Sequence, residues 1–335
     1  MRFHLTPEQV AIQDAVRGTL AECWGMDQLH RFADGDEDFD PASWQALMAL
    51  GIGALALPED QGGAGLGLLD AALVCEVVGA ACAPGPVIAQ IVAAMAVAAS
   101  PYPATRDLLG AIASGEKVVT FALGSDLVQC ARAADLFLAD DGAGGWQLIE
   151  AGDGVAIESQ PSTDRSRPVS RVSFGTVEAH PLFAPGDPLI ERLTQAALVL
   201  IAADSLGGAQ HCTQLSVDYA KTREQFGQPI GRFQGLKHQL AQMALEVEPA
   251  RALVWYAGYA WDAALDDAPR AAAQAKAHLG EVYTRTTRAA VAAHGGIGYT
   301  WEYGLNYWFR RSVLNRAWLG SPAQHRARAA ELAGW

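Results

Sequence analysis

The second half of the sequence is dominated by long, alanine-rich amphipathic stretches. They cover roughly 189–221, 236–266, 270–294 and 305–332, and Pro229 and Gly295-Gly296 interrupt them. Apolar residues recur at helical spacing in each stretch, so each is expected to form a helix with one buried face. Three or four such helices in succession favour a helix bundle from about residue 188 to residue 335.

The first 115 residues also have helical patterning. Thr6, Pro7 and Gln9 form a capping-box pattern with proline at the first helical position. Asp40-Pro41 has the signature of a second helix start, and the glycine-rich loop 62–67 precedes a helix expected over about Leu69 to Val78. We therefore expect an N-terminal helical domain over residues 1–115.

Residues 116–187 differ from both flanks. Short β-type runs, separated by Gly, Asp, Ser and Pro, occur at Val118–Leu123, Asp135–Ala139, Trp146–Glu150 and Arg171–Phe174. The fold class expected is mainly α with a small central β domain (α+β): a shortened β domain at 116–187 between the helical domain 1–115 and a C-terminal four-helix bundle at 188–335.

Charge and cysteine content exclude several classes of function. The chain has 24 basic and 37 acidic residues, a net charge of −13, and no cluster of Lys and Arg, which argues against nucleic acid as a partner. The five cysteines are odd in number and lack CxxC spacing, so neither a disulfide framework nor a metal site is expected. The N-terminal sequence lacks an apolar signal segment, and the longest apolar runs are about half a bilayer span. We expect a cytoplasmic protein that does not enter the membrane.

Four segments with distinctive glycine, proline and aromatic residues occur in order along the chain. The first runs from Trp44 through Leu57-Pro58-Glu59-Asp60 to Gly65, and the second is Ala83-Pro84-Gly85-Pro86. The third is Arg223-Glu224-Gln225-Phe226-Gly227-Gln228-Pro229-Ile230-Gly231-Arg232-Phe233-Gln234, and the fourth runs from His294-Gly295-Gly296 to Tyr303. Together they resemble the acyl-CoA dehydrogenase family, and the resemblance spans about residues 5 to 330. It implies the family's order of helical, β and four-helix domains.

The third and fourth segments contain the candidate cofactor site. Arg223 ends a helix before a Gly/Pro turn, and the planar fork of an arginine suits a pyrophosphate. The resemblance implies that this arginine reaches across a subunit interface to the FAD of a neighbouring chain. It also implies that the glycine pair allows close backbone approach to the cofactor. The implied FAD contacts are Arg223, Gln225, Phe226, Ile230, Phe233, Gly295 and Gly296. Taken alone, an arginine at a helix end is a solvated charge and a glycine pair is a turn.

The catalytic base of the family is absent. Family members remove the α-proton of an acyl-CoA with a glutamate while a hydride leaves the β-carbon for the flavin. Counted from Gly295-Gly296, its common place here is Trp318-Leu319-Gly320-Ser321, and the alternative place before the arginine motif is Ala197. None of these residues can accept a proton as a carboxylate does. Glu191, about 9 Å earlier along the helix, is the alternative candidate for a substitute base, although an acid in the first turn of a helix is the more ordinary role. We therefore predict no catalytic residue.

The β segment also lacks the family's flavin-holding loop, because Phe121-Ala122-Leu123 runs directly into Gly124-Ser125-Asp126. The chain thus retains the part of a flavin site that reaches into a neighbour and lacks the part that holds a flavin in its own chain. This combination resembles α2β2 acyl-CoA dehydrogenases of actinobacteria, many of which act on bulky CoA thioesters such as steroid side chains. We predict a half-site subunit that shares FAD with a fuller, glutamate-bearing partner subunit. The alternatives are a stand-alone acyl-CoA-processing enzyme with a displaced base, and a flavin-free scaffolding paralogue.

Overall fold

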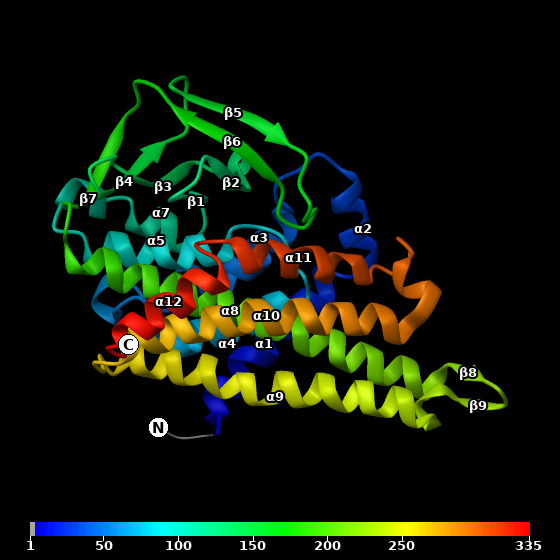
Figure 1. The fold of residues 1–335 in the computed structure, drawn as a ribbon. Coiled ribbons are helices and arrows are strands. Elements are labelled where there is room, and N and C mark those ends of the chain that lie inside the picture. The colour runs from blue at the N-terminus through cyan, green and yellow to red at the C-terminus, as the bar shows by residue number, and fades with distance from the viewer. Residues whose placement is uncertain (1–3) are drawn as a thin grey trace.

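The computed structural model describes residues 4–335 as a predominantly helical molecule capped on one side by β-sheets (Figure 1). The mainly α fold class with a small central β portion is confirmed. None of the helices among residues 4–335 has the length and apolar character that crossing a membrane requires.

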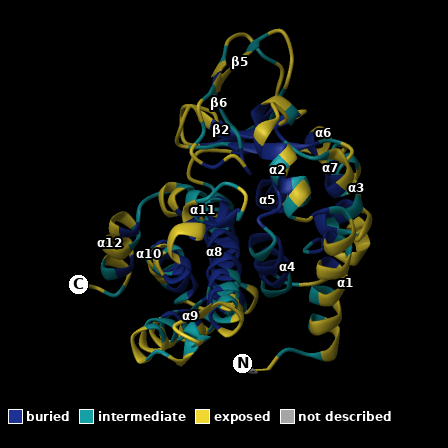
Figure 2. Ribbon diagram, turned by 90° about the vertical axis from the view of Figure 1, so that its right-hand side faces the viewer, coloured by how far each residue is buried: buried dark blue, intermediate teal, exposed yellow. Residues whose placement is uncertain are grey.

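The N-terminal helices begin where the sequence signals predict. Thr6 caps the first helix in a capping box with Gln9, and the Asp40 carboxylate accepts a hydrogen bond from the backbone N–H of Ser43. The elements are α1 (Pro7–Cys23), α2 (Met26–Asp34), α3 (Pro41–Ala49), the 3₁₀ turns η1 (Ile52–Ala54) and η2 (Glu59–Gln61), α4 (Leu68–Ala80), α5 (Val87–Ala99), α6 (Pro103–Arg106) and α7 (Leu109–Ala113). Helices α4 and α5 are buried almost throughout (Figure 2).

The β portion contains two sheets. One has the order β1 (Val119–Ala122), β3 (Leu136–Asp140), β4 (Trp146–Glu150), β7 (Ala179–Phe183), with β1 parallel to β3 and the other pairs antiparallel. The other is antiparallel, in the order β2 (Leu127–Gln129), β6 (Val169–Phe174), β5 (Val155–Gln160). A short 3₁₀ turn, η3 (Ala131–Ala133), follows β2. A separate apolar cluster that includes Phe137, Ile149 and Val172 joins the two sheets.

Three of these strands were not expected from the sequence. β2 has too few residues to show a period, and β5 alternates without strong burial. β7 contains Pro181, which cannot donate a ladder hydrogen bond and is tolerated because β7 is an edge strand. The β portion is therefore richer in strands than the sequence suggested.

Long helices form the C-terminal part: α8 (Pro188–Thr222), α9 (Gln234–Asp262) and α10 (Ala268–His294). The expectation of a single helix over 305–332 is wrong. It is divided into α11 (Leu305–Ala317) and α12 (Pro322–Leu332), because Leu319 and Gly320 have positive φ and Pro322 starts a new capped helix. The break coincides with the expected base position.

Helix α8 crosses the centre of the molecule and packs closely on α4 (Figure 2). A Cβ atom at Gly79 would lie 2.0 Å from the Asp204 carbonyl oxygen, and one at Gly207 would lie 1.8 Å from that of Glu76. Only glycine permits this approach of two helix backbones. Four of the five cysteines are buried as expected, whereas Cys23 is half-buried.

Candidate functional site

A short hairpin that connects α8 to α9 projects beyond the ends of both helices (Figure 1). It consists of β8 (Glu224–Gln225) and β9 (Gln228–Pro229), joined by Phe226 and Gly227. These two residues have φ of 54° and 77°, the left-handed pair that a tight two-residue hairpin turn requires. Phe226 is 91% exposed, an unusual combination of conformation and exposure for an aromatic residue.

Arg223 is fixed at its backbone and free at its side chain. Its N–H donates to the Tyr219 carbonyl and its own carbonyl accepts from the Ile230 N–H, both at 2.8 Å. Its exposed guanidinium makes no hydrogen bond or ion pair with any residue of the described range 4–335. By contrast, Lys221 on the preceding turn is 3.2 Å from the Asp218 carboxylate.

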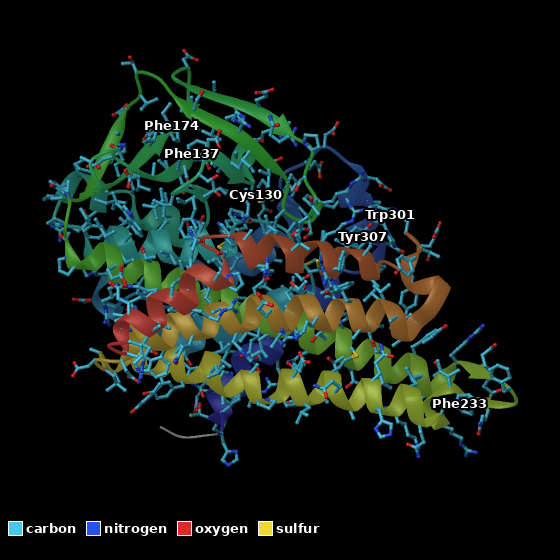
Figure 3. All side chains as sticks on the ribbon, in the orientation of Figure 1. Cys130, Phe137, Phe174, Phe233, Trp301 and Tyr307 are labelled. Atoms are coloured by element: carbon cyan, nitrogen blue, oxygen red, sulfur yellow. The ribbon has the colours of Figure 1, made fainter. Side chains whose placement is uncertain are left out.

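The other expected residues of the third segment cluster around this hairpin. The rings of Phe226 and Phe233 meet edge-to-face with centroids 5.9 Å apart, and Phe233 lies at the base of the projection (Figure 3). Ile230 is half-buried in the 3₁₀ turn η4 (Ile230–Arg232). The exposed Gln225 amide donates to the neighbouring Glu224 carbonyl at 2.9 Å.

The glycine pair begins the 3₁₀ turn η5 (Gly295–Tyr299) at the end of α10. Gly295 has a φ of +64°, which favours glycine. Cβ atoms at Gly295 and Gly296 would meet no atom of residues 4–335 within 4 Å, whereas one at Gly298 would lie 2.8 Å from the Val291 carbonyl oxygen. The packing described here therefore gives no steric reason for glycine at position 296.

An aromatic contact joins the two groups of expected residues. Tyr219, one turn before Arg223, stacks on His294, the residue before Gly295, with ring centroids 4.5 Å apart. His294 Nδ1 lies 2.7 Å from the Ala290 carbonyl oxygen, and burial lowers its pKa below the ordinary value. The hairpin and the glycine turn therefore lie at the same end of the helical part.

The two expected base positions converge on one cavity. A cavity of about 910 Å³ lies between the β portion and the helices, and both Ala197 of α8 and Trp318–Gly320 line it. The Trp318 ring is 5.9 Å from that of Phe121 and lies under the Arg167 guanidinium at 5.7 Å. The structure thus brings together the positions that the sequence placed at the reacting centre, and none of them has a carboxylate.

Two of the nearby carboxylates are already engaged. Asp164 lines the cavity but is fully buried, 3.6 Å from the Arg311 guanidinium. Glu191 does not line the cavity, lies in the first turn of α8 and is 3.7 Å from Arg328. Its first-turn role agrees with expectation.

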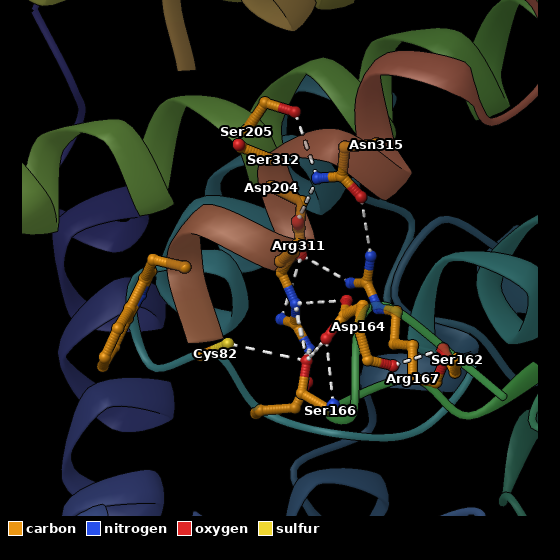
Figure 4. A network of polar contacts seen from close by, with 12 residues as sticks. Cys82, Ser162, Asp164, Ser166, Arg167, Asp204, Ser205, Arg311, Ser312 and Asn315 are labelled. Carbon is orange, nitrogen blue, oxygen red and sulfur yellow. Dashed lines mark hydrogen bonds and ion pairs between the residues drawn. The ribbon is translucent and has the colours of Figure 1, made fainter. Parts of the chain in front are cut away.

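A buried polar network lies beside this cavity (Figure 4). Arg167, from the β5–β6 loop, donates to the Asp204 carboxylate of α8 at 2.6 Å and to the Asn315 carbonyl of α11 at 3.0 Å. Arg311 of α11 is 3.6 Å from both Asp204 and Asp164. Two arginines and two aspartates thus connect the β portion to two helices, a feature that sequence spacing does not reveal.

A second cavity, of about 590 Å³, lies between α1, α4, α8 and α11. His211 stacks on Trp308 there at 4.3 Å, and burial lowers the pKa of His211 to about 4. Burial also raises the pKa of Glu76 to about 7, although the Trp255 indole donates to its carboxylate at 2.7 Å and Arg251 lies 3.5 Å away. Sequence reasoning did not identify this cavity.

Two family models match the chain. The model of the acyl-CoA dehydrogenase N-terminal domain matches residues 6–116, and that of the acyl-CoA dehydrogenase C-terminal domain matches residues 189–333. Among curated proteins, acyl-CoA dehydrogenase IpdE2 of Mycobacterium tuberculosis is 32% identical over 325 residues, covering 96% of each chain. Acyl-CoA dehydrogenase FadE34 of the same organism is 30% identical over 346 residues, covering 92% of this chain and 45% of FadE34.

Solved structures with the same fold include two with composite names. A variant of the Tcur3481-Tcur3483 steroid ACAD superposes with a TM-score of 0.88 at 26% identity, covering 98% of each chain. A chain of the ChsE4-ChsE5 complex from Mycobacterium tuberculosis superposes with a TM-score of 0.89 at 24% identity, covering 100% of this chain and 99% of that one.

Proposed function

The chain belongs to the acyl-CoA dehydrogenase family, and from this premise we propose that it is the half-site subunit of a heteromeric, FAD-dependent acyl-CoA dehydrogenase. It contributes Arg223 and the Gly295-Gly296 turn to the flavin of a partner subunit. The partner supplies the catalytic glutamate, and the two subunits together desaturate a CoA thioester between its α- and β-carbons.

One observation above all supports this proposal: Arg223 combines a fixed backbone with an exposed side chain that is unpaired within the described residues. Its guanidinium is exposed and without a partner in residues 4–335, while its backbone is held by Tyr219 and Ile230. A planar guanidinium donates two parallel hydrogen bonds to a phosphate. Such a group at the end of a projecting hairpin suits the pyrophosphate of a flavin held by another chain.

The glycine turn supports the same interpretation. Space for a Cβ atom exists at Gly296, so an external group that approaches the backbone closely would explain why a side chain is absent. Phe226 and Phe233 offer apolar faces beside the arginine, and Gln225 and Ile230 complete the proposed contact surface. FAD, when bound, accepts the hydride that leaves the β-carbon of the acyl group.

The missing base supports assignment of the chemistry to the partner. Ala197 and Trp318–Gly320 line one cavity without supplying a proton acceptor. No catalytic residue is proposed in this chain.

The names of two neighbours guide the choice of partner and substrate. One structure is named a ChsE4-ChsE5 complex, and the other is a Tcur3481-Tcur3483 steroid ACAD. Both names join two proteins, which supports a second acyl-CoA dehydrogenase subunit as partner, and the second name supports a bulky acyl group.

We also propose the division into 1–115, 116–187 and 188–335, because the family models match segments close to the first and last of these.

The test is the flavin content of purified protein. The chain is expressed alone and together with a glutamate-bearing acyl-CoA dehydrogenase encoded beside it, and absorbance at flavin wavelengths is compared with protein concentration. We expect a colourless lone chain and a yellow complex with about one flavin for every two chains. A yellow lone chain that turns over a CoA thioester would support a stand-alone enzyme, and a colourless complex would support a scaffold. Either result would overturn the proposal.

A further inference from the structure

The 910 Å³ cavity that holds the expected base positions differs from a flavin or CoA site in its charge. Arg171 is the only Lys or Arg among its described lining residues, and Arg171 is paired with Asp126 at 2.6 Å. Asp140 and Asp164 also line it. A diphosphate placed here would lie near carboxylates without a free cation, and unpaired charges are costly to remove from water. The residues present do not suit FAD.

Backbone and hydroxyl donors near the cavity do not compensate for the missing free cation. Gly320 lines the cavity just before α12, but the N-terminus of α12 is already capped by Ser321 and Gln324. The Ser162 and Thr194 hydroxyls donate to the backbone carbonyls of Asp164 and Ile190. The helix N-terminus and these two hydroxyls are therefore already used by contacts within the chain.

The walls suit an apolar body instead. Trp318 presents a broad ring positioned by Phe121 and Arg167, and further apolar side chains surround it. These are Leu123, Leu127, Val169, Ala197, Val313, Leu314 and Leu319. Leu127 and Val313 are 48% and 40% exposed, so two apolar side chains of the cavity wall are in contact with water. A cavity of this size lined mainly by apolar groups is typical of small-molecule sites.

One polar side chain beside these walls has no hydrogen-bond partner within residues 4–335. Gln129 lines the cavity and is 7% exposed, yet its side-chain amide makes no hydrogen bond to any residue between 4 and 335. The amide atoms of Gln129 are accessible from the cavity rather than sealed off, so a ligand hydroxyl or carbonyl can replace the water that pairs with them. The amide can pair with a neutral hydroxyl or carbonyl, whereas no free cation among the described lining residues offsets the charge of an ion.

We propose that this cavity binds an uncharged, largely apolar ligand whose hydroxyl or carbonyl group pairs with Gln129, and that it does not turn this ligand over. The inference rests on the proposed function only in assigning the flavin to another chain. A free neutral lipid fits this description, whereas the acyl part of a CoA thioester offers the same apolar chemistry with a charged remainder, and the competitors below distinguish the two.

The experiment uses the lone chain and the neutral dye Nile red, whose fluorescence rises in an apolar site. Competitors are 1-decanol, decanoate and decanoyl-CoA, which share one alkyl chain and differ in the head group. We expect 1-decanol to displace the dye and decanoate to compete at least about tenfold more weakly, because no cation offsets its charge. Equal or stronger competition by decanoyl-CoA would indicate a CoA site and overturn the proposal, as would the absence of displaceable dye.

Two substitutions locate the site. Ala317→Trp fills the cavity from an exposed lining position, so folding is retained, and it should abolish displaceable dye binding. Ala263→Trp adds the same side chain at an exposed position outside the cavity and should leave dye binding unchanged. Equal effects of the two tryptophan variants on dye binding would overturn the assignment of the ligand to this cavity.

Gln129→Leu should retain the dye but reduce the preference for 1-decanol over decane. These readouts need no flavin, so their failure is distinguishable from failure of the proposed function.

Discussion

Tyr219 of α8 and His294 of α10 stack with ring centroids 4.5 Å apart. The residue four positions after Tyr219 is Arg223, and the residue after His294 is Gly295. The stack therefore fixes the relative position of two segments that lie about seventy residues apart and that the proposed flavin site requires together. Burial lowers the pKa of His294 below its ordinary value, which favours the neutral ring and is consistent with a packing role.

The first prediction concerns Arg223. In the co-expressed complex, Arg223→Ala should remove a charge-assisted phosphate contact of about 1.5–3 kcal/mol and lower flavin affinity by about tenfold to a hundredfold. Lys221→Ala removes the same charge from a residue paired with Asp218 and should leave flavin content unchanged. Flavin titration of both variants checks this, and equal flavin affinity in the Arg223 variant and the parent would refute the assignment.

The second prediction separates ligand approach from folding at the glycine turn. Gly296→Ala adds a methyl group into open space and should change the free energy of unfolding by less than about 0.5 kcal/mol. The same variant should reduce the flavin content of the complex. Gly298→Ala places a Cβ 2.8 Å from the Val291 carbonyl oxygen and should destabilise the chain by about 1–3 kcal/mol. Chemical denaturation and flavin absorbance measure the two effects, and a Gly296 variant with normal flavin content would contradict the model of close approach.

The third prediction concerns the buried network. Arg311→Met leaves Asp164 without a buried cation and Asp204 with Arg167 alone, and should destabilise the chain by about 3–5 kcal/mol. Arg310→Met loses one exposed hydrogen bond to the Thr163 carbonyl and should cost at most about 1.5 kcal/mol. Urea unfolding of the two variants provides the comparison. Similar costs at both positions would mean that the network contributes no more than a surface contact.

The fourth prediction is a pH dependence caused by Glu76. Its folded pKa is raised by burial from 4.5 to about 7, so between these values the folded state retains a proton that the unfolded state releases. Stability from this group therefore falls as pH rises through that window, by about 3 kcal/mol in total, and is constant above it. Burial lowers the pKa of His211 to about 4, so the stability that His211 contributes rises with pH. The effect of Glu76 is therefore measured as the difference in stability between a Glu76 variant and the parent.

Glu76→Gln should abolish the contribution of this carboxyl. The variant should gain stability relative to the parent as pH rises from 5 to 8, measured as the difference in denaturation midpoint. Glu248→Gln, at a side chain 61% exposed beside the same Arg251, should show no such trend. A constant difference between Glu76→Gln and the parent over this range would show that Glu76 is ionised throughout in the folded chain.

The sequence predicted the long helices well because their caps and apolar periods are local signals. Thr6 and Asp40 act as caps where expected, and α8 and α10 begin and end within two residues of the stretches assigned to them. The break at Trp318–Ser321 was missed because amphipathic patterning continues across it. The edge strand with Pro181 was missed because a strand containing proline depends on its neighbour rather than on its own sequence.

The candidate site was predictable only in part. The motif containing Arg223 is continuous in sequence, so its position at a helix end could be anticipated. By contrast, Gln129, Ala197 and Trp318 come from three separate elements, and their meeting at one cavity depends on how the β portion packs on α8 and α11. The burial of Asp204 beside Arg167 and Arg311 is likewise a property of tertiary packing, which residue spacing does not encode.

The hairpin that follows Arg223 extends past the ends of α8 and α9, so its exposed side chains face water in the lone chain and are open to association. A ligand held between this hairpin and another chain adds its binding free energy to the association of the two chains. Retention of that ligand then depends on protein concentration, and dilution weakens ligand binding and subunit association together. Thermodynamic reciprocity requires that saturating ligand tighten the assembly by the same factor.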